Sequence, residues 1–197
     1  AFTISSFACA DEVREHEFSA NDLDTLRMDV NVGSITIRAG DSDSIKVHLV
    51  LDNDGDDSWF SFSSDSNLDA STDMESDIRG SSLYLRFNEE DIKSTWEIEV
   101  PEHFSTEIDM AVGAVEISGL EGDQEVDLAV GSVSIEQKES TIAEIQLKSN
   151  VGDTGVSGMR SDNSRTALIG SSTSARGEGR SYIEVTVNVG EANVRAR

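Results

Sequence analysis

The chain has 197 residues, 37% of them hydrophobic and 27% charged, which excludes an intrinsically disordered polymer and is enough for one folded domain. The net charge of −24 and the pI of about 4.2 exclude nucleic acid and anionic membrane surfaces as partners, because phosphates bind basic surfaces. Aromatic residues make up only 6%, so small branched side chains must fill the core, which favours thin stacked strands. Such an acidic surface is typical of soluble proteins generally and of proteins secreted in saline habitats, and the composition leaves both open.

Residues 1–10 read AFTISSFACA, and Ala8-Cys9-Ala10 before Asp11 has the small–x–small form of a signal-peptidase site. We interpret this segment as the remnant of a signal peptide or a disordered N-terminus, and expect an exported protein that is periplasmic, on the cell surface or secreted. A second interpretation is a degenerate lipobox with a lipid on Cys9. As the single cysteine, Cys9 excludes an internal disulfide. We also expect no transmembrane segment, because no apolar run has the length of a membrane span.

Residues 11–197 are predicted to form a single domain. Its first part contains one clear repeat within 23–51, then an Asp/Ser-rich stretch at 52–81 that we expect to be an exposed excursion. Strands are expected again at 83–87 and 96–101. The aromatic side chains in the excursion can anchor it to the core or form a platform for sugar rings; these are Trp59, Phe60 and Phe62.

The excursion begins with a weak candidate for a Ca²⁺ site. Asp52, Asp54, Asp56 and Asp57 surround a turn glycine, Gly55, and hard oxygen ligands suit Ca²⁺. The register of an EF-hand loop is absent, however, and a solvated acidic loop is the alternative. We therefore expect no cofactor apart from this possible Ca²⁺ ion.

A repeat of V-G units runs through the chain. When each glycine is numbered zero, positions −5, −3, −1, +2 and +4 are apolar in 23 of 25 cases. The five repeat glycines are Gly33, Gly113, Gly131, Gly152 and Gly190. Because apolar and polar residues alternate on either side of the glycine, we expect two half-buried strands joined at a glycine corner. All five apolar positions, including −1, are predicted to point into the core.

The repeats follow one another at intervals near twenty residues: 18 from Gly113 to Gly131, 21 to Gly152, and 20 from Gly170 to Gly190, with a degenerate coil around Gly170. This period predicts an all-β fold, a single elongated β-solenoid or β-roll of stacked strand–Gly–strand units paired in parallel. In such a stack Val112, Val130 and Val151 should lie one above another inside the core. Residues 185–194 should then form the final coil.

The sequence W-E-I-E-V-P at 96–101, the run G-V-E-I-S-G-L-E-G-D and the repeated V-G-x-V-x-I units resemble the bacterial DUF4097 family, also labelled putative adhesins. The resemblance covers residues 23–197 and its motifs are structural rather than catalytic. It implies a β-solenoid-like domain of the cell envelope and supplies no catalytic residues. The acidic excursion and the degenerate Gly170 coil depart from the family pattern.

Motifs for chemistry are few. The histidines, His16, His48 and His103, do not stand at metal-ligand spacing, and neither a nucleophile elbow nor a phosphate-binding loop is present. Some parallel β-helices act on acidic polysaccharides with Ca²⁺ and a basic residue, so a polysaccharide-acting enzyme on this scaffold is the alternative function. The arginines available for it are Arg160, Arg165, Arg176 and Arg180; the competing interpretation places them in surface turns.

We therefore expect a non-catalytic bacterial protein of the envelope or exterior that acts as an adhesion, scaffold or binding module. Its partner would be a surface or extracellular ligand, a glycan or a protein. Residues 1–110 contain 26 acidic and 7 basic residues, whereas 158–197 contain four acidic residues and six arginines. This difference in charge would also favour end-to-end self-association.

Overall fold

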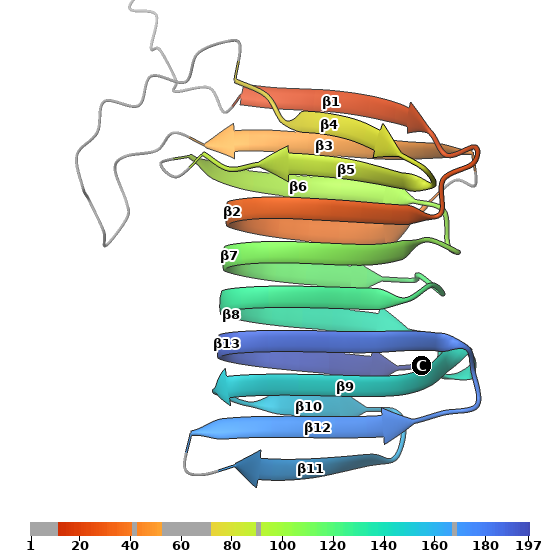
Figure 1. Cartoon of the computed structure of the whole chain (residues 1–197), viewed down its shortest axis with the longest axis vertical. Coiled ribbons are helices and arrows are strands. Elements are labelled where there is room, and N and C mark those ends of the chain that lie inside the picture. Colours follow the sequence, from red (N-terminus) through yellow and green to blue (C-terminus); the bar gives the residue numbers. More distant parts are fainter. Residues whose placement is uncertain (1–11, 41–42, 53–71, 90–91, 167–168) are drawn as a thin grey trace, which may run out of the picture.

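The structure is a computed structural model that describes residues 12–40, 43–52, 72–89, 92–166 and 169–197. These residues form an all-β architecture in which thirteen strands belong to one mixed sheet (Figure 1). The strands are β1 (Glu12–Ser19), β2 (Thr25–Ala39), β3 (Ser44–Asp52), β4 (Glu75–Arg79), β5 (Ser82–Phe87), β6 (Lys93–Val100), β7 (Ser105–Ser118), β8 (Gln124–Gln137), β9 (Ile142–Val151), β10 (Thr154–Ser157), β11 (Ser161–Thr166), β12 (Gly170–Arg176) and β13 (Ser181–Ala196), with one 3₁₀ turn at Glu139–Thr141. The expectation of an all-β fold is confirmed.

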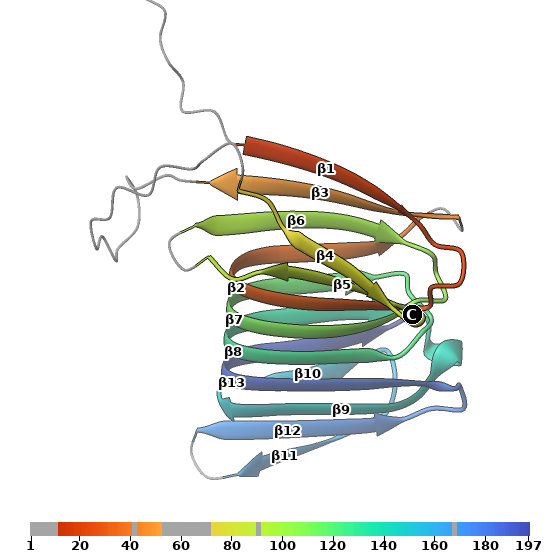
Figure 2. The same cartoon turned by 45° about the horizontal axis from the view of Figure 1, so that its top comes forward.

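Four long strands, β2, β7, β8 and β13, bend back on themselves at their V-G unit, so that the sheet folds over into two layers (Figures 1 and 2). The first halves of these strands form the front layer of Figure 1 and the second halves form the back layer. Strands β9 and β10 make a fifth bent unit, interrupted at Gly152. Within the stack all five repeat glycines lie in one line: Gly33 pairs with Gly113, Gly113 with Gly131 and Gly131 with Gly190, and Gly152 lies against the Gly190 carbonyl.

The bend requires glycine for two physical reasons. The repeat glycines have φ angles between 138° and 152°, a region that residues with a Cβ rarely occupy. In addition, a Cβ built at Gly131 would collide with the carbonyl oxygen of Gly113, and one at Gly190 would collide with that of Gly131. The predicted glycine corner is therefore present, and stacking explains why the same letters recur.

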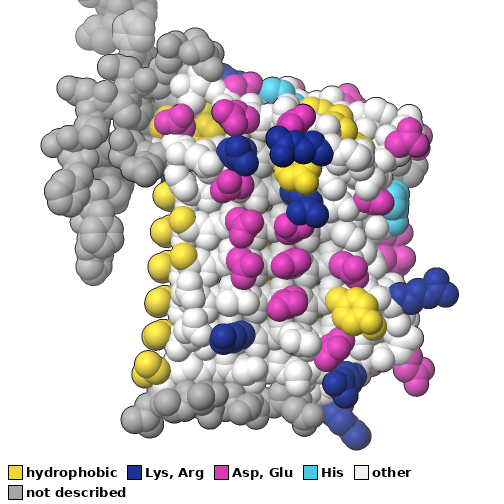
Figure 3. Space-filling view, viewed as in Figure 1, with side chains coloured by type: hydrophobic (Ala, Val, Ile, Leu, Met, Phe, Trp, Pro, Cys, Tyr) yellow, Lys and Arg dark blue, Asp and Glu magenta, His cyan; other side chains and the backbone are white. Residues whose placement is uncertain are grey.

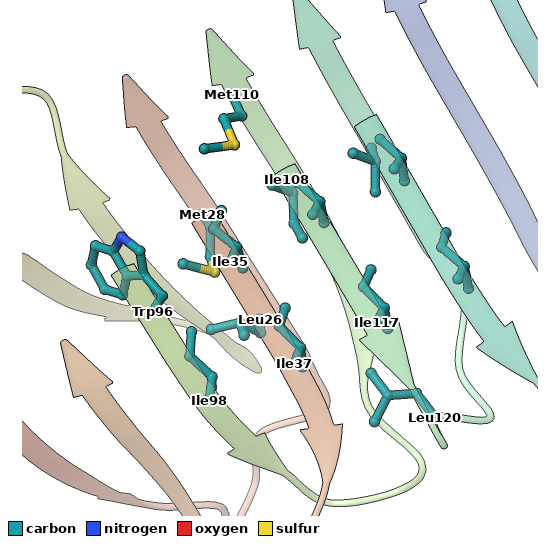
Figure 4. Packing of buried hydrophobic residues seen from close by; sticks show 14 of the residues in the cluster. Leu26, Met28, Ile35, Ile37, Trp96, Ile98, Ile108, Met110, Ile117 and Leu120 are labelled. Atoms are coloured by element: carbon teal, nitrogen blue, oxygen red, sulfur yellow. The ribbon is translucent and has the colours of Figure 1, made fainter. Parts of the chain in front are cut away.

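Four of the five repeat positions point inward as predicted. In β7, Ile108 and Met110 precede the bend and Val115 and Ile117 follow it, and all four are buried (Figure 4). The prediction for position −1 is wrong: Val112 is 45% exposed. The residues at −2 and −1 both lie on the convex side of the corner, so inward alternation resumes only at +2.

The order of the stack also differs from the prediction. Strand β13 does not form the final coil but lies between β8 and the β9–β10 unit, pairing in parallel with both. Gly170 is not a bend; it begins β12, which is antiparallel to β9. The repeat pattern fixes which residues face the core, but every bent strand presents an equivalent edge, so spacing alone does not determine the order of neighbours.

The two ends of the sheet contain antiparallel strands, in contrast to the expected all-parallel stack. Strands β6, β3 and β1 extend the back layer at one end, with β5 and β4 on the front, and β12 and β11 extend the front layer at the other end. The sheet is not closed, because β1 and β11 end its path.

One hydrophobic core fills the space between the layers, as the side chains in Figure 4 show. Trp96 is fully buried, and its indole N–H donates to the Ser94 hydroxyl at 2.9 Å. Two repeat positions are polar, Ser149 and Thr154. The Ser149 hydroxyl donates to the Gly190 carbonyl at 2.9 Å, and Thr154 bonds to the buried hydroxyls of Ser171 and Thr173, so these groups are satisfied inside the core.

Candidate functional site

The residues at position −1 form a line of apolar side chains along the bend edge, which we name the valine ladder; all of them are exposed except Val32, which is half-buried. Its members are Val32, Val112, Val130, Val189 and Val151, in spatial order, and each pairs in register with the next. Ile169, directly before β12, lies next to the end of the line, since its carbonyl accepts from the Gly152 amide at 2.8 Å. The yellow line at the left edge of Figure 3 shows this ladder.

Four valines of the ladder are exposed to a similar extent, and Val32 at its end is half-buried. Val112, Val130, Val151 and Val189 are 43–45% exposed, and Ile169 is 62% exposed. Covering the exposed part of one such valine would be worth about 1 kcal/mol, since full burial is worth roughly 1.5–3 kcal/mol. Within the fold this free energy is not gained. Contiguous exposed apolar side chains of this kind are typical of interaction sites.

Small side chains lie beside the ladder on the front face. At position −2 the stack contains Asn31, Ala111, Ala129, Asn188 and Asn150. The amide of Asn150 donates to the side-chain oxygen of Asn188 at 2.7 Å. A shallow hollow of about 300 Å³ crosses this part of the face and is lined by Ala111, Ala129 and neighbouring aspartates. A ligand can therefore approach the backbone closely here.

Two columns of acidic side chains run parallel to the ladder across the front layer and are coloured magenta in Figure 3. The aspartate column, at position −4, contains Asp29, Asp109 and Asp127, and the glutamate column, at −6, contains Glu107, Glu125 and Glu184. Parallel register places each carboxylate next to another at the strand spacing of about 4.8 Å. Like charges directly opposite one another destabilise a sheet, so this arrangement is not explained by folding.

Part of this charge is neutralised at one end of the columns. Arg86 pairs with Asp29 at 3.2 Å and Arg27 pairs with Glu107 at 2.5 Å. The other four carboxylates make no hydrogen bond or ion pair with any residue in the described part of the chain; they are Asp109, Asp127, Glu125 and Glu184.

The pKa values of two of these carboxyl groups are raised, first by partial burial and then by the neighbouring charges. Partial burial raises the pKa of Asp109 above its usual value, and the neighbouring charges of Asp127, Asp29 and Glu107 raise it further. Partial burial likewise raises the pKa of Glu125, followed by the charges of Glu107 and Glu184. A cation placed over the columns would relieve both effects.

The back face differs in its charge pattern. Across β1, β3, β6 and β2 one row reads Glu17, Lys46, Glu99 and Arg38, so that opposite charges alternate. A hollow of about 600 Å³ lies over this region. Lys46 approaches Glu99 at 4.0 Å, as expected of charges that balance one another on a solvated sheet. This row of the back face therefore lacks the like-charge pairing of the two front-face columns.

Most of the residues predicted from sequence do not form a site. Of the Ca²⁺ candidates, Asp52 ends β3, whereas Asp54, Asp56 and Asp57 lie outside the described residues, as do Cys9, Trp59, Phe60 and Phe62. Among the described residues no group of three or more His, Cys, Asp or Glu side chains is arranged to hold a metal ion. The Ca²⁺ loop thus stays a prediction.

The histidines and arginines are dispersed. His16 pairs with Asp73 at 3.0 Å, His48 lies 3.7 Å from Glu15, and His103 contacts the ring of Phe104. Of the arginines considered for catalysis, Arg160, Arg176 and Arg180 are exposed, and Arg176 pairs with Glu144 at 3.6 Å. The side chain of Arg165 lies outside the described set.

One hollow does bring arginines and carboxylates together, on the front face beside β4 and β5, with a volume of about 450 Å³. Tyr84 lies between Arg27 and Arg79, whose guanidinium carbons are 5.5 and 5.1 Å from its ring centre. The arginines here are ion-paired: Arg79 with Asp77 at 2.7 Å and Arg86 with Asp29. These contacts connect β4 and β5 to β2, and each arginine of the hollow is paired with a carboxylate.

Sequence reasoning missed the ladder and the columns as surfaces. The signal was present, because aligning the repeats on their glycines places aspartate at −4 and glutamate at −6 in consecutive units. What was missing was the direction of position −1, which depends on the corner geometry.

Comparison with known proteins supports the fold. No protein-family model matches the chain, and no curated protein matches it. A crystal structure described as a putative cell adhesion protein from Clostridium sporogenes is similar over 95% of this chain and 100% of that one, with a TM-score of 0.56 and 14% sequence identity. At this identity the similarity shows the fold alone. Within the described residues no helix is long and apolar enough to cross a membrane.

Proposed function

We propose that the protein is a non-catalytic adhesion or scaffold module that is exported and binds a surface or extracellular ligand. The observation that carries this proposal is the valine ladder, in which four of the five bent units expose an apolar residue in the same register, with the half-buried Val32 at one end. The similar crystal structure, described as a putative cell adhesion protein, supports the same class of function.

We further propose that the chain is a β-solenoid-like member of the DUF4097 family. The in-register stack of V-G corners and the buried Trp96 and Ile98 in the strand before Pro101 support this proposal. Export, a signal peptide at residues 1–10 and end-to-end self-association through the outer strands stay predictions.

The proposal predicts saturable binding that depends on the ladder. Fluorescently labelled protein would be titrated onto bacterial cells and onto immobilised envelope and polysaccharide fractions. The test variant combines Val112→Thr, Val130→Thr and Val189→Thr, which keep the side-chain shape while making the ladder polar. A matched control, Val50→Thr, changes a half-buried valine on the back layer.

We expect the triple variant to lose at least tenfold in affinity while its melting temperature stays within a few degrees, and the control to bind normally. Equal binding by wild type and triple variant would contradict the proposal. Incubation with acidic glycans, followed by measurement of new reducing ends, separates binding from turnover. Release of reducing ends above that of a heat-denatured control would favour an enzyme instead.

A further inference from the structure

The shape of the valine ladder restricts what can cover it. Five residues at the strand spacing of about 4.8 Å extend about 19 Å along the sheet axis, perpendicular to the strands. Ile169 lies next to the end of this line. The occupant is therefore elongated and contacts the protein along a straight line of side chains.

A helix matches this line better than an extended chain does. Side chains on one face of an α-helix recur once per turn, about every 5.4 Å, which is close to the ladder spacing. Residues on one side of an extended strand recur about every 6.6–6.8 Å and fall out of step after two rungs. A helix of about 13 residues spans the five valines, because each residue advances it by about 1.5 Å.

The charge beside the ladder defines the flank of this helix. Asp109 lies three positions before Val112 along the strand, so the aspartate column lies at most about 10 Å from the ladder. A helix with its side chains is about 10–12 Å wide, so one resting on the valines and on the small floor of Ala111 and Ala129 brings its flank over the acidic columns. Lysine or arginine on that flank would meet the carboxylates of Asp109, Asp127 and Glu125.

Other occupants fit less well. A second copy of the chain would place acidic columns against acidic columns, at a net charge of −24 for each copy. An anionic lipid surface or a polyanion would be repelled in the same way. A polycation without an apolar face would satisfy the columns but leave the ladder exposed.

We propose that the valine ladder and the acidic columns together bind a cationic amphipathic helix of a partner protein, which lies along the sheet axis across the bends of β2, β7, β8 and β13. This inference rests on the proposed function, since it names the class of partner for the same surface. The apolar stripe of the helix covers the ladder, and its basic flank neutralises the columns.

The test uses the full chain and three synthetic peptides of about 16 residues. The first contains leucine at i, i+3, i+4 and i+7 with lysine along one flank; the second has the same composition in an order that destroys the apolar stripe; the third is polylysine. Binding would be measured by fluorescence anisotropy at 0.15 M and 1 M NaCl, and peptide helicity by circular dichroism.

Three sets of variants locate the site. One is the ladder triple variant defined above. The second combines Asp109→Asn, Asp127→Asn and Glu125→Gln. The third removes the same charge from the back face through Glu15→Gln, Glu97→Gln and Glu116→Gln, and serves as the matched control.

We expect the amphipathic peptide to become helical on binding, and expect both the ladder and column variants to weaken it about tenfold or more. The column variants should also reduce the salt dependence, whereas the back-face variant should bind within about twofold of wild type. Equal affinity for the scrambled peptide or polylysine, or an equal loss in the back-face variant, would overturn the inference, as would no binding. If cell adhesion depends on the ladder but the cationic peptide neither binds nor competes with adhesion, only the inference about the partner fails. If adhesion does not depend on the ladder, the proposed function fails as well.

Discussion

Replacement of Gly131 by alanine tests the physical basis of the bend. The new Cβ would collide with the carbonyl oxygen of Gly113, and the residue would occupy a φ of 145°. Backbone strain of this kind costs about 1–3 kcal/mol, and overpacking against a fixed neighbour costs about 1–3 kcal/mol more. We therefore expect a loss of about 2–6 kcal/mol in the free energy of unfolding, a large part of the 5–15 kcal/mol typical of a domain.

Gly80 offers a matched control. It also has a positive φ, 61°, but a Cβ built there would meet nothing within 4 Å. Gly80→Ala should therefore cost only about 1 kcal/mol, the ordinary penalty of the left-handed region. Urea unfolding followed by circular dichroism and tryptophan fluorescence would measure both variants. If Gly131→Ala destabilises no more than Gly80→Ala, the close approach of stacked glycine backbones is not what specifies the corner.

Two further predictions concern the ladder and the columns. Val130→Asp should change the free energy of unfolding by less than about 1 kcal/mol, because this side chain is exposed. Val133→Asp should prevent folding, because it buries an unpaired charge. Thermal denaturation distinguishes the two variants, and similar melting temperatures would contradict the outward direction of Val130 and the inward direction of Val133. Because the pKa values of Asp109 and Glu125 are raised, the folded chain binds more protons than the unfolded chain just above the usual carboxyl range, so their contribution to stability should rise as pH falls from 7 through that window. Asp109→Asn should stabilise the protein at pH 7 by a few tenths of a kcal/mol and reduce this increase on acidification; urea unfolding from pH 4 to 7 measures both, and an unchanged pH profile would contradict it.

The sequence predicts the bent strand well, and physical chemistry explains why. Burial at positions −5, −3, +2 and +4 follows from alternation, and Gly131 at the corner follows from the lack of a Cβ. Val130 was assigned wrongly because alternation was extended one residue too far into the bend. At the corner both Ala129 and Val130 face outward. Both residues are apolar, so their residue type does not show that they lie on the surface and not in the core.

The position of β13 was beyond sequence reasoning for another reason. Units with the same pattern of buried residues expose interchangeable edges, so Val189 can pair with Val130 or follow Val151 without change in the local pattern. The choice depends on the connections: the chain between β10 and β13 forms the antiparallel pair β11–β12 beside β9. The acidic columns were likewise visible only once the register between strands was known.

Disulfide formation between ladder positions tests whether the bend valines lie on the outside in the order Val112, Val130, Val189, Val151. In a Cys9→Ser background, cysteines at 130 and 189 would be neighbours at about 4.8 Å between Cα atoms, within the disulfide range of about 4.4–6.8 Å, whereas cysteines at 130 and 151 would be about 9.6 Å apart. We expect rapid oxidation of the first pair and none of the second in the folded protein. Cross-linking of 130 to 151 but not to 189, or thiols that stay unreactive until the chain unfolds, would contradict it.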